Sequence, residues 1–214
     1  MEARIFIVED HPIFQEGLAN IISEEEGLQV CGTADDVAEA LAGIERTTPH
    51  LVIIDLELKA SSGFDLVKDV TARWPHLRTL VLSMYDEMHY AGRVLRAGAA
   101  GYVMKDQGPE VVLQAIHAVL QGRQYVSEAV RQRLGEHGPY TSPVDALTDR
   151  ELQIFQCLGK GKSVFQTALL LRRSVKTIHN HIGNIQTKLQ IESRQELYQR
   201  AREWVLRADR ASDM

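Results

Sequence analysis

Five polar side chains in the first half of the chain follow short apolar runs, and their types suit one kind of chemistry. Glu9 and Asp10 follow residues 5–8, Asp55 follows 51–54, Ser83 follows 79–82 and Lys105 follows 101–104. If these runs are parallel strands, their carboxyl ends meet at one edge of a sheet, where ligands bind in open α/β folds. We therefore expect the five side chains to lie together, provided that the first, third, fourth and fifth strands are neighbours.

Carboxylates held close together repel, and a hard divalent cation relieves that repulsion. Magnesium prefers oxygen ligands and bridges to phosphate oxygens. A carboxylate can attack a phosphoryl group in line to give an acyl phosphate, while an ammonium and a hydroxyl hold the phosphoryl oxygens. Any one acid at a strand end is more commonly a helix cap or a solvated loop residue. Five residues in this order favour a phosphoryl-transfer site that uses Mg²⁺.

The elements that position this set alternate along the first half. The apolar runs are at 5–8, 28–32, 51–54, 79–82 and 101–104, and the amphipathic stretches between and after them are at 12–26, 35–46, 63–74, 86–98 and 109–121. Short, continuous apolar runs indicate strands buried on both faces. Five strand–helix repeats predict an α/β fold with a five-stranded, parallel, doubly wound sheet, because parallel strands need crossover connections.

The pattern changes after this first predicted domain, which covers residues 1–121. Residues 122–143 are expected to be a linker, although the sequence leaves open whether 122–134 form an extra helix. Residues 144–208 are expected to form a small all-α domain of four short helices. Serine or threonine caps mark the starts of these helices. The caps are Thr148, Ser163, Ser174 and Ser193.

Charge and composition limit the classes of function. Residues 1–144 carry 12 basic and 21 acidic residues, a net charge of −9, whereas residues 145–214 carry 12 basic and 8 acidic residues, a net +4. The basic half is the candidate for nucleic acid, although a solvated face also explains so small a charge. No apolar run is long enough to span a membrane and the N-terminus does not resemble a signal peptide, so we expect a cytoplasmic protein. Reduced thiols are the favoured state of the two cysteines.

A helix starting at Val175 supplies a second candidate site. The residues Ile178, Ile182, Ile185 and Leu189 share one stripe of it at helical spacing and are expected to pack inward. The opposite face presents polar or small residues, which are Lys176, His179, Asn180, Gly183 and Thr187. A helix in the major groove of DNA uses such a face, because asparagine bonds adenine while lysine and threonine reach phosphates. For any single residue, an ordinary solvated face is an equally good interpretation.

Residues 1–121 resemble a CheY-type receiver domain. The runs EDHPIFQEGL at 9–18 and LRAGAAGY at 95–102 resemble the NarL/FixJ family of response regulators in particular. The resemblance implies that Asp55 is the phosphoacceptor. It also implies that Asp10, Asp55 and the backbone carbonyl of Glu57 bind Mg²⁺, with help from Glu9.

Three further roles follow from the same resemblance. Ser83 would be the switch hydroxyl, Lys105 the lysine that pairs with the phosphoryl group, and Tyr102 the aromatic that changes orientation, although a core tyrosine is nearly as good an interpretation. Two departures concern the loops: residues 56–63 lack the proline that the family usually has, and Asp106 replaces the proline common after the lysine. These departures bear on loop rigidity and phosphoryl lifetime, because no reacting group is lost.

Residues 147–197 resemble a LuxR-type DNA-binding domain through many matches at fixed spacing. The resemblance implies a helix-turn-helix. We expect its DNA contacts to come from six residues, Arg173, Lys176, Thr177, His179, Asn180 and Lys188. The family commonly has lysine at position 179, so histidine there predicts weaker or pH-sensitive binding. In the family a surface on the last helix pairs two such domains, but we expect Leu197 and Ala201 to be core residues.

These observations predict a two-component response regulator. A partner histidine kinase would phosphorylate Asp55, which would favour a homodimer that binds double-stranded DNA and controls transcription. The protein would not be an enzyme beyond its own phosphoryl transfer. Two alternatives stay open: a regulator of the same fold that works without phosphorylation, and a magnesium-dependent phosphohydrolase. The intact acidic set disfavours the first, and the helix-turn-helix disfavours the second.

Overall fold

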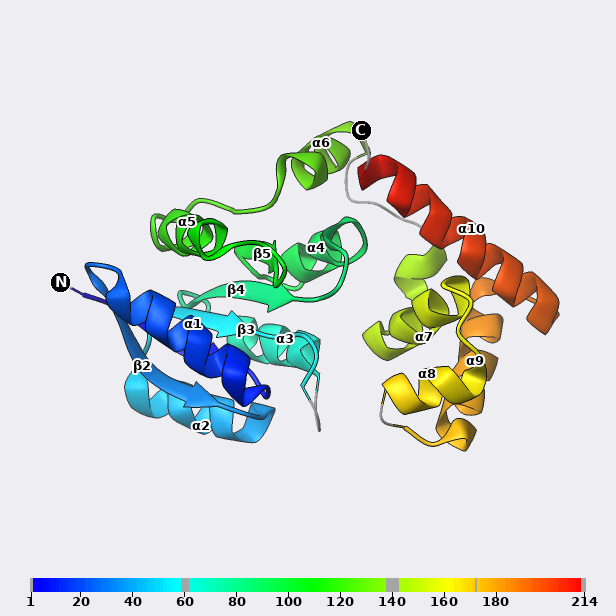
Figure 1. Cartoon of the computed structure of the whole chain (residues 1–214), viewed down its shortest axis with the longest axis horizontal. Helices are drawn as coiled ribbons and strands as arrows, with labels where there is room; N and C mark the ends of the chain where they lie inside the picture. The colour runs from blue at the N-terminus through cyan, green and yellow to red at the C-terminus, as the bar shows by residue number, and fades with distance from the viewer. Residues whose placement is uncertain (1, 59–61, 138–142, 172, 213–214) are drawn as a thin grey trace. The chain divides into compact units, whose positions relative to one another are not determined.

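The computed structural model of the chain describes residues 2–58, 62–137, 143–171 and 173–212. The chain folds into two compact units, Met1–Glu136 and His137–Met214, each of which is considered by itself (Figure 1). Among the described residues, no helix is both long enough and apolar enough to cross a membrane. Cys31 and Cys157 are not joined in a disulfide.

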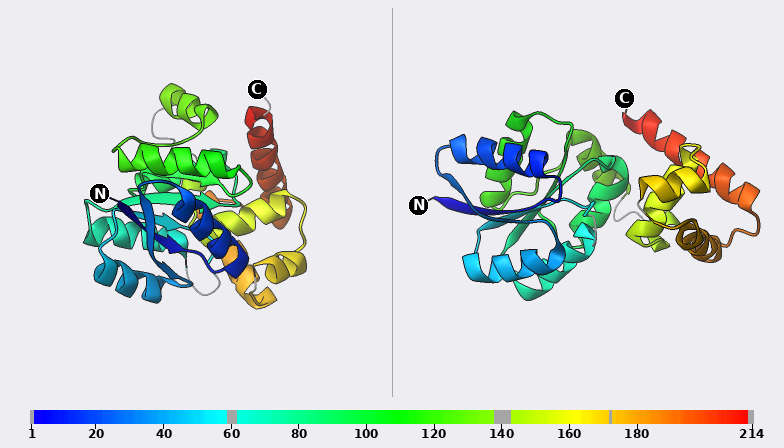
Figure 2. Two further views of the ribbon diagram at one scale, coloured as in Figure 1. Left: turned by 60° about the vertical axis from the view of Figure 1, so that its left-hand side comes forward. Right: turned by 60° about the horizontal axis from the view of Figure 1, so that its bottom comes forward.

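The first unit is a parallel sheet of five strands with helices on both faces (Figures 1 and 2). The strands are β1 (Ala3–Val8), β2 (Leu28–Ala34), β3 (Leu51–Ile54), β4 (Arg78–Ser83) and β5 (Gly101–Met104). The helices that follow them are α1 (Pro12–Glu24), α2 (Val37–Thr47), α3 (Gly63–Arg73), α4 (Glu87–Arg96) and α5 (Pro109–Leu120). The strand order β2-β1-β3-β4-β5 makes the first, third, fourth and fifth strands neighbours and confirms the predicted fold class.

Successive side chains of the buried strands point to opposite faces of the sheet. Ile5 and Ile7 of β1 belong to the core cluster that α1 and α5 complete, and both are fully buried. Phe6 points to the other face, where its ring packs so closely on Gly43 of α2 that a Cβ there would lie 2.4 Å from a ring carbon. Both faces of the sheet are therefore buried. This explains why the sequences of the strands are continuous apolar runs.

The linker predicted over 122–143 is in part an ordered piece of the first unit. Tyr125 extends the sheet at its β5 edge, since its N–H donates to the carbonyl of Ala100 (3.0 Å) and its carbonyl accepts the N–H of Tyr102 (2.9 Å). Helix α6 (Glu128–His137) follows, with Val130 buried and the hydroxyl of Ser127 bonded to a carboxylate of α4. The tertiary partners of this segment lie far away in sequence, so local composition does not reveal them. The domain boundaries expected from the sequence, at residues 121/122 and 143/144, remain predictions.

The second unit is helical. It contains a short 3₁₀ helix (Pro143–Ala146), α7 (Asp149–Gly159), α8 (Val164–Leu170), α9 (Val175–Leu189) and α10 (Arg194–Ser212). Thr148 and Ser163 each form a complete capping box, and the hydroxyls of Ser174 and Ser193 accept N–H groups of the first turn of α9 and α10. All four predicted helix starts are therefore confirmed, because N-cap chemistry is a local property of the sequence.

Candidate functional site

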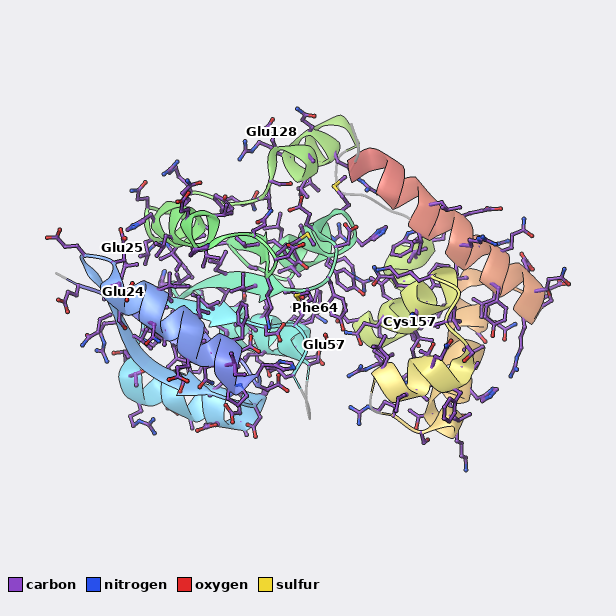
Figure 3. All side chains as sticks on the ribbon, in the orientation of Figure 1. Glu24, Glu25, Glu57, Phe64, Glu128 and Cys157 are labelled. Atoms are coloured by element: carbon purple, nitrogen blue, oxygen red, sulfur yellow. The ribbon has the colours of Figure 1, made fainter. Side chains whose placement is uncertain are left out.

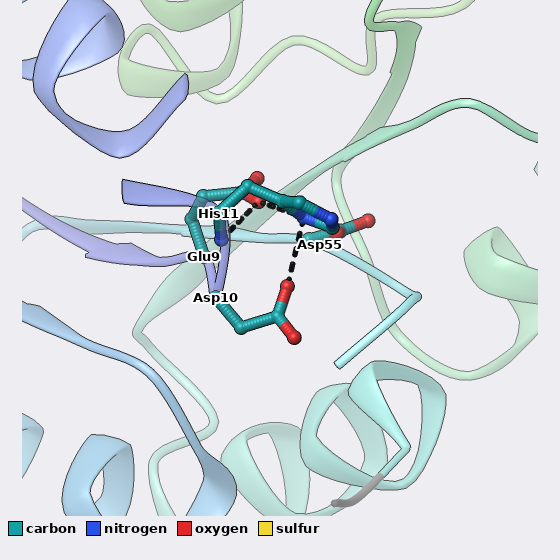
Figure 4. A group of neighbouring side chains, drawn as sticks. All are labelled: Glu9, Asp10, His11 and Asp55. Carbon is teal, nitrogen blue, oxygen red and sulfur yellow. Dashed lines mark hydrogen bonds and ion pairs between the residues drawn. The ribbon is translucent and has the colours of Figure 1, made fainter. Parts of the chain in front are cut away.

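Three carboxylates meet at the carboxyl edge of the sheet, as predicted. Glu9 and Asp10 follow β1 and Asp55 follows β3, and each is only 2% exposed. Together with His11 they offer four ligand atoms that all lie within 4.8 Å of one another (Figure 4). Buried carboxylates this close repel one another strongly, so the arrangement calls for a cation.

Lys105, which follows β5, supplies one such cation. Its side chain is 6% exposed, and its ammonium donates to Oδ2 of Asp55 at 2.9 Å and to Oε2 of Glu9. Burial alone would lower the pKa of Lys105, but the charge of Asp55 and the hydrogen bonds to both carboxylates outweigh burial and raise the pKa. Burial and the charge of Asp55 raise the pKa of Glu9, against the effect of Lys105. The strand order thus brings Lys105 together with Asp55, 50 residues away, and with Glu9, 96 residues away along the chain.

His11 is a member of this cluster that sequence reasoning missed. Its Nδ1 lies 2.9 Å from Oδ1 of Asp10 and 3.1 Å from Oε1 of Glu9, while about half of its side chain remains exposed. The available signal was its position directly after two acids at a strand end, next to Pro12, which begins α1.

Ser83 is the last residue of β4, as predicted, and Tyr102 lies within the neighbouring strand β5. The hydroxyl of Ser83, completely buried, accepts the N–H of Tyr85 at 3.2 Å. The hydroxyl of Tyr102 donates to the carbonyl of Tyr85 at 2.7 Å, and its ring is buried. Burial raises the pKa of Tyr102 well above its usual range, against a hydrogen bond with Ser83. The tyrosine is therefore neutral and turned inward in this conformation.

The loop after Asp55 approaches the site through its backbone. The N–H of Glu57 donates to Oδ1 of Asp55 at 3.1 Å, and Figure 3 labels Glu57 at this edge of the sheet. The chain returns so close to the strand that a Cβ on Gly63 would lie 1.8 Å from the carbonyl oxygen of Asp55. Only glycine fits there. Residues 59–61, within the loop that lacks the usual proline, lie outside the described residues.

In the second unit, α9 has the predicted two faces. Ile178, Ile182, Ile185 and Leu189 are buried. The residues predicted to contact DNA all have exposed or partly exposed side chains. They are Arg173, Lys176, Thr177, His179, Asn180 and Lys188. Leu197 and Ala201 of α10 are fully buried, which confirms that they are core residues.

Three members of this set have protein partners that the sequence did not predict. The guanidinium of Arg194 donates to Nδ1 of His179 at 2.7 Å, which makes Nδ1 an acceptor and leaves Nε2 to carry the proton of a neutral ring. The ammonium of Lys188 lies 2.6 Å from Oε2 of Glu151. Thr177 bonds the hydroxyl of the N-cap residue Ser174 at 2.8 Å. The two long-range contacts join α9 to α10 and to α7.

Each of the two units matches a known protein family. Residues 5–117 match the family described as "Response regulator receiver domain", and residues 145–201 match "Bacterial regulatory proteins, luxR family". The first match alone covers more than half of the chain. The carboxylates and Lys105 fall inside the first matched range, and the two-faced helix α9 falls inside the second.

Known proteins resemble nearly the whole chain. It is 30% identical to the nitrate/nitrite response regulator protein homolog of Haemophilus influenzae, over 89% of this chain and 92% of that protein. It is 33% identical to the nitrate/nitrite response regulator protein NarP of Escherichia coli K12, over 89% and 90% of the two chains.

Solved structures of response regulators also resemble this chain. The structure of RcsB from Salmonella enterica serovar Typhimurium, bound to promoter rprA in the presence of phosphomimetic BeF₃⁻, is 25% identical and matches 93% of this chain and 98% of that one with a TM-score of 0.63. A LuxR-family two-component response regulator from Aurantimonas sp. SI85-9A1 is 34% identical and matches 64% and 98% of the two chains with a TM-score of 0.60. This chain therefore belongs to the two-component response regulators that join a receiver domain to a LuxR-type DNA-binding domain, and its function is the regulation of transcription.

Proposed function

We propose that Asp55 accepts a phosphoryl group from a partner histidine kinase and that this event controls binding to double-stranded DNA. One observation carries the proposal. The ammonium of Lys105 is bonded to Asp55 and Glu9 at the same time, inside a cluster of buried carboxylates. A lysine held there is already in position to pair with oxygens of a phosphoryl group that joins Asp55.

The donor set fits Mg²⁺. Three carboxylates within 4.8 Å of one another are the oxygen ligands that this ion prefers. Asp10, Asp55 and the backbone carbonyl of Glu57 would hold it, with Glu9 assisting. When bound, the ion neutralises charge on the phosphoryl oxygens and on the carboxylates.

The chain's own residues perform the remaining steps. An Oδ atom of Asp55 attacks the phosphorus while the donor's leaving group departs in line, and an acyl phosphate results. Lys105, whose raised pKa keeps it cationic at neutral pH, then pairs with a phosphoryl oxygen. The buried hydroxyl of Ser83 turns to another phosphoryl oxygen, which breaks its contacts with Tyr85 and Tyr102. Tyr102 is thereby the side chain that changes orientation.

The output is DNA binding by a homodimer. A phosphorylated receiver that favours pairing holds two helix-turn-helix domains together, and two domains read two half-sites with more avidity than one. On each α9, His179 and Asn180 would read bases, while Lys176, Thr177 and Lys188 would contact the DNA backbone together with Arg173, which lies just before the helix. RcsB, to which this chain is similar, is bound to a promoter in the presence of a phosphomimetic. A protein with this role acts in the cytoplasm of a bacterium, where the chromosome lies.

The test is phosphorylation of the full chain by acetyl phosphate, followed by mass spectrometry. We expect a single phosphoryl group, on Asp55, that forms only with Mg²⁺ present. Asp55→Asn keeps the shape of the side chain and removes the attacking oxygen, so labelling should stop. Asp106→Asn is the matched control, because Asp106 is an exposed aspartate near the site with no proposed part in forming the bond to phosphorus. Undiminished labelling of Asp55→Asn would contradict the assignment, and no labelling of the parent would favour a phosphorylation-independent regulator.

A further inference from the structure

A cavity of about 520 Å³ opens beside the phosphoryl-acceptor site. Its polar lining consists of His11, Asp55, Glu57, Lys105 and Gln107, and Figure 4 shows His11 and Asp55 in the acidic cluster. The remaining wall is largely apolar, with Ile13, Phe14, Leu82, Met84, Pro109 and Val112 among its residues. The volume is far larger than Mg²⁺ and a phosphoryl group need.

The apolar wall is built by the same turns that deliver the reacting groups. Ile13 and Phe14 lie in the first turn of α1, just after the acidic pair, and Met84 directly follows Ser83. Ile13 is 90% exposed and Met84 62% exposed, so both reach into solvent at the mouth of the cavity. The ammonium of Lys105 lies 4.5 Å from the centre of the Phe14 ring. Charged groups that act on a phosphoryl group therefore directly adjoin a surface suited to hydrocarbon.

We propose that this cavity holds the leaving group of small-molecule phosphodonors and selects acyl phosphates whose acyl chain is apolar and longer than acetyl. The proposal rests on the proposed role of Asp55 as acceptor. An Oδ atom of Asp55 forms the new bond to phosphorus while the bond from phosphorus to the bridging oxygen breaks. The acyl group leaves as a carboxylate with the electron pair of that bond, so no proton transfer and no co-reactant are needed.

The selectivity follows from burial of hydrocarbon. The methyl group of an acetyl donor fills little of the cavity, whereas a butyryl donor adds two methylene groups that can lie against Ile13, Phe14 and Met84. Buried methylene groups in such a pocket each improve binding severalfold, because apolar surface leaves water. Acetate and butyrate are nearly equally good leaving groups, so a difference between the two donors reports on the pocket rather than on chemical reactivity.

The experiment compares acetyl phosphate with butyryl phosphate on the full chain in Mg²⁺, with the rate of Asp55 phosphorylation at subsaturating donor as the readout. We expect butyryl phosphate to react about tenfold faster per mole. In Met84→Ser and Ile13→Ser the ratio of the two rates should fall toward one. Leu206→Ser, which also removes an exposed leucine-sized apolar side chain but lies on α10, should keep the parent's ratio.

A binding measurement keeps the test independent of the transfer step. Acetonylphosphonate and its homologue with two more methylene groups have CH₂ in place of the bridging oxygen and cannot transfer phosphoryl. Calorimetry with the full chain should give a Kd about tenfold lower for the longer compound, and Met84→Ser should abolish that difference. Equal rates for both donors, or equal Kd values, would overturn the leaving-group pocket while Asp55 stays the acceptor. Failure of both donors to label Asp55 would instead overturn the proposed function.

Discussion

The ammonium of Lys188, in the last turn of α9, lies 2.6 Å from Oε2 of Glu151, in the first turn of α7. Glu151 is 3% exposed, and the same oxygen accepts the N–H of Thr148 at 2.8 Å. Burial alone would raise the pKa of Glu151, but the hydrogen bonds from Lys188 and Thr148 outweigh it and lower the pKa. One carboxylate thus both caps α7 and anchors the helix that presents Asn180.

Glu151 should make the stability of the DNA-binding unit depend on pH. Because its pKa is lower in the folded than in the unfolded chain, its contribution is complete above the ordinary value of 4.5 and is lost as pH falls through the folded value. Glu151→Gln should therefore lower the free energy of unfolding by about 1–3 kcal/mol at neutral pH. The difference from the parent should shrink as the pH is lowered through that range.

The positions of the two tryptophans allow the free energy of unfolding to be measured for the second unit alone. Trp74 lies in the first unit and Trp204 in the second, where its ring is 5.8 Å from that of Phe155 in α7. Urea unfolding followed by fluorescence in a Trp74→Phe background therefore reports on the second unit. Glu196→Gln breaks an exposed pair with Arg200 and should cost only about 0.5 kcal/mol. An equal loss in both variants would show that burial of the Glu151 pair is unimportant.

Much of the fold and site follows from local signals, and the failures share a cause. The carboxyl ends of buried strands predicted where Asp55 and Lys105 would lie, and cap residues predicted the helix starts, because both depend on a few adjacent residues. The pairing of Lys188 with Glu151 joins residues 37 apart, and Tyr125 joins β5 through backbone groups that carry no sequence signature. Contacts of this kind become visible only in three dimensions.

Arg173 and Lys188 should both set DNA affinity but differ in salt dependence. Arg173 is exposed and, among the described residues, no ion pair involves its guanidinium. Arg173→Gln should weaken binding to all sequences alike and reduce the slope of log K against log salt by about one unit. Lys188→Gln should change the slope less, because Glu151 already neutralises that ammonium. Titrations at several salt concentrations measure both slopes, and a larger change for Lys188 would reverse their assigned roles.

His179 and Asn180 should set sequence preference. The guanidinium of Arg194 is bonded to Nδ1 of His179 and leaves Nε2 open to a base, and Asn180 is exposed one position further along α9. His179→Ala and Asn180→Ala should each change the sites recovered in a selection from random DNA, because base contacts specify while phosphate contacts position. Gln195→Ala, at an exposed site on α10, is the control. Unchanged sites in both variants would mean that another face reads the bases.

Phosphorylation and DNA binding should favour each other by the same factor. Coupling between two binding equilibria is reciprocal, with a typical size of about 1–3 kcal/mol. The expected carrier is dimerisation, which holds two helix-turn-helix domains at half-sites about 10 base pairs apart. Operator DNA should accordingly raise the phosphorylated fraction of the parent at limiting donor, and phosphorylation should tighten binding at fixed salt and protein concentration.

Two variants separate this coupling from simple DNA affinity. Asp55→Asn should bind DNA as weakly as the unphosphorylated parent whether or not donor is present. The fragment 144–214, which carries a net charge near +4 and lacks the acidic receiver, should bind without any donor. If the full chain binds equally well with and without phosphoryl on Asp55, the receiver does not gate the DNA-binding domain. The regulator would then work independently of phosphorylation, and the acidic cluster around Asp55 would need another explanation.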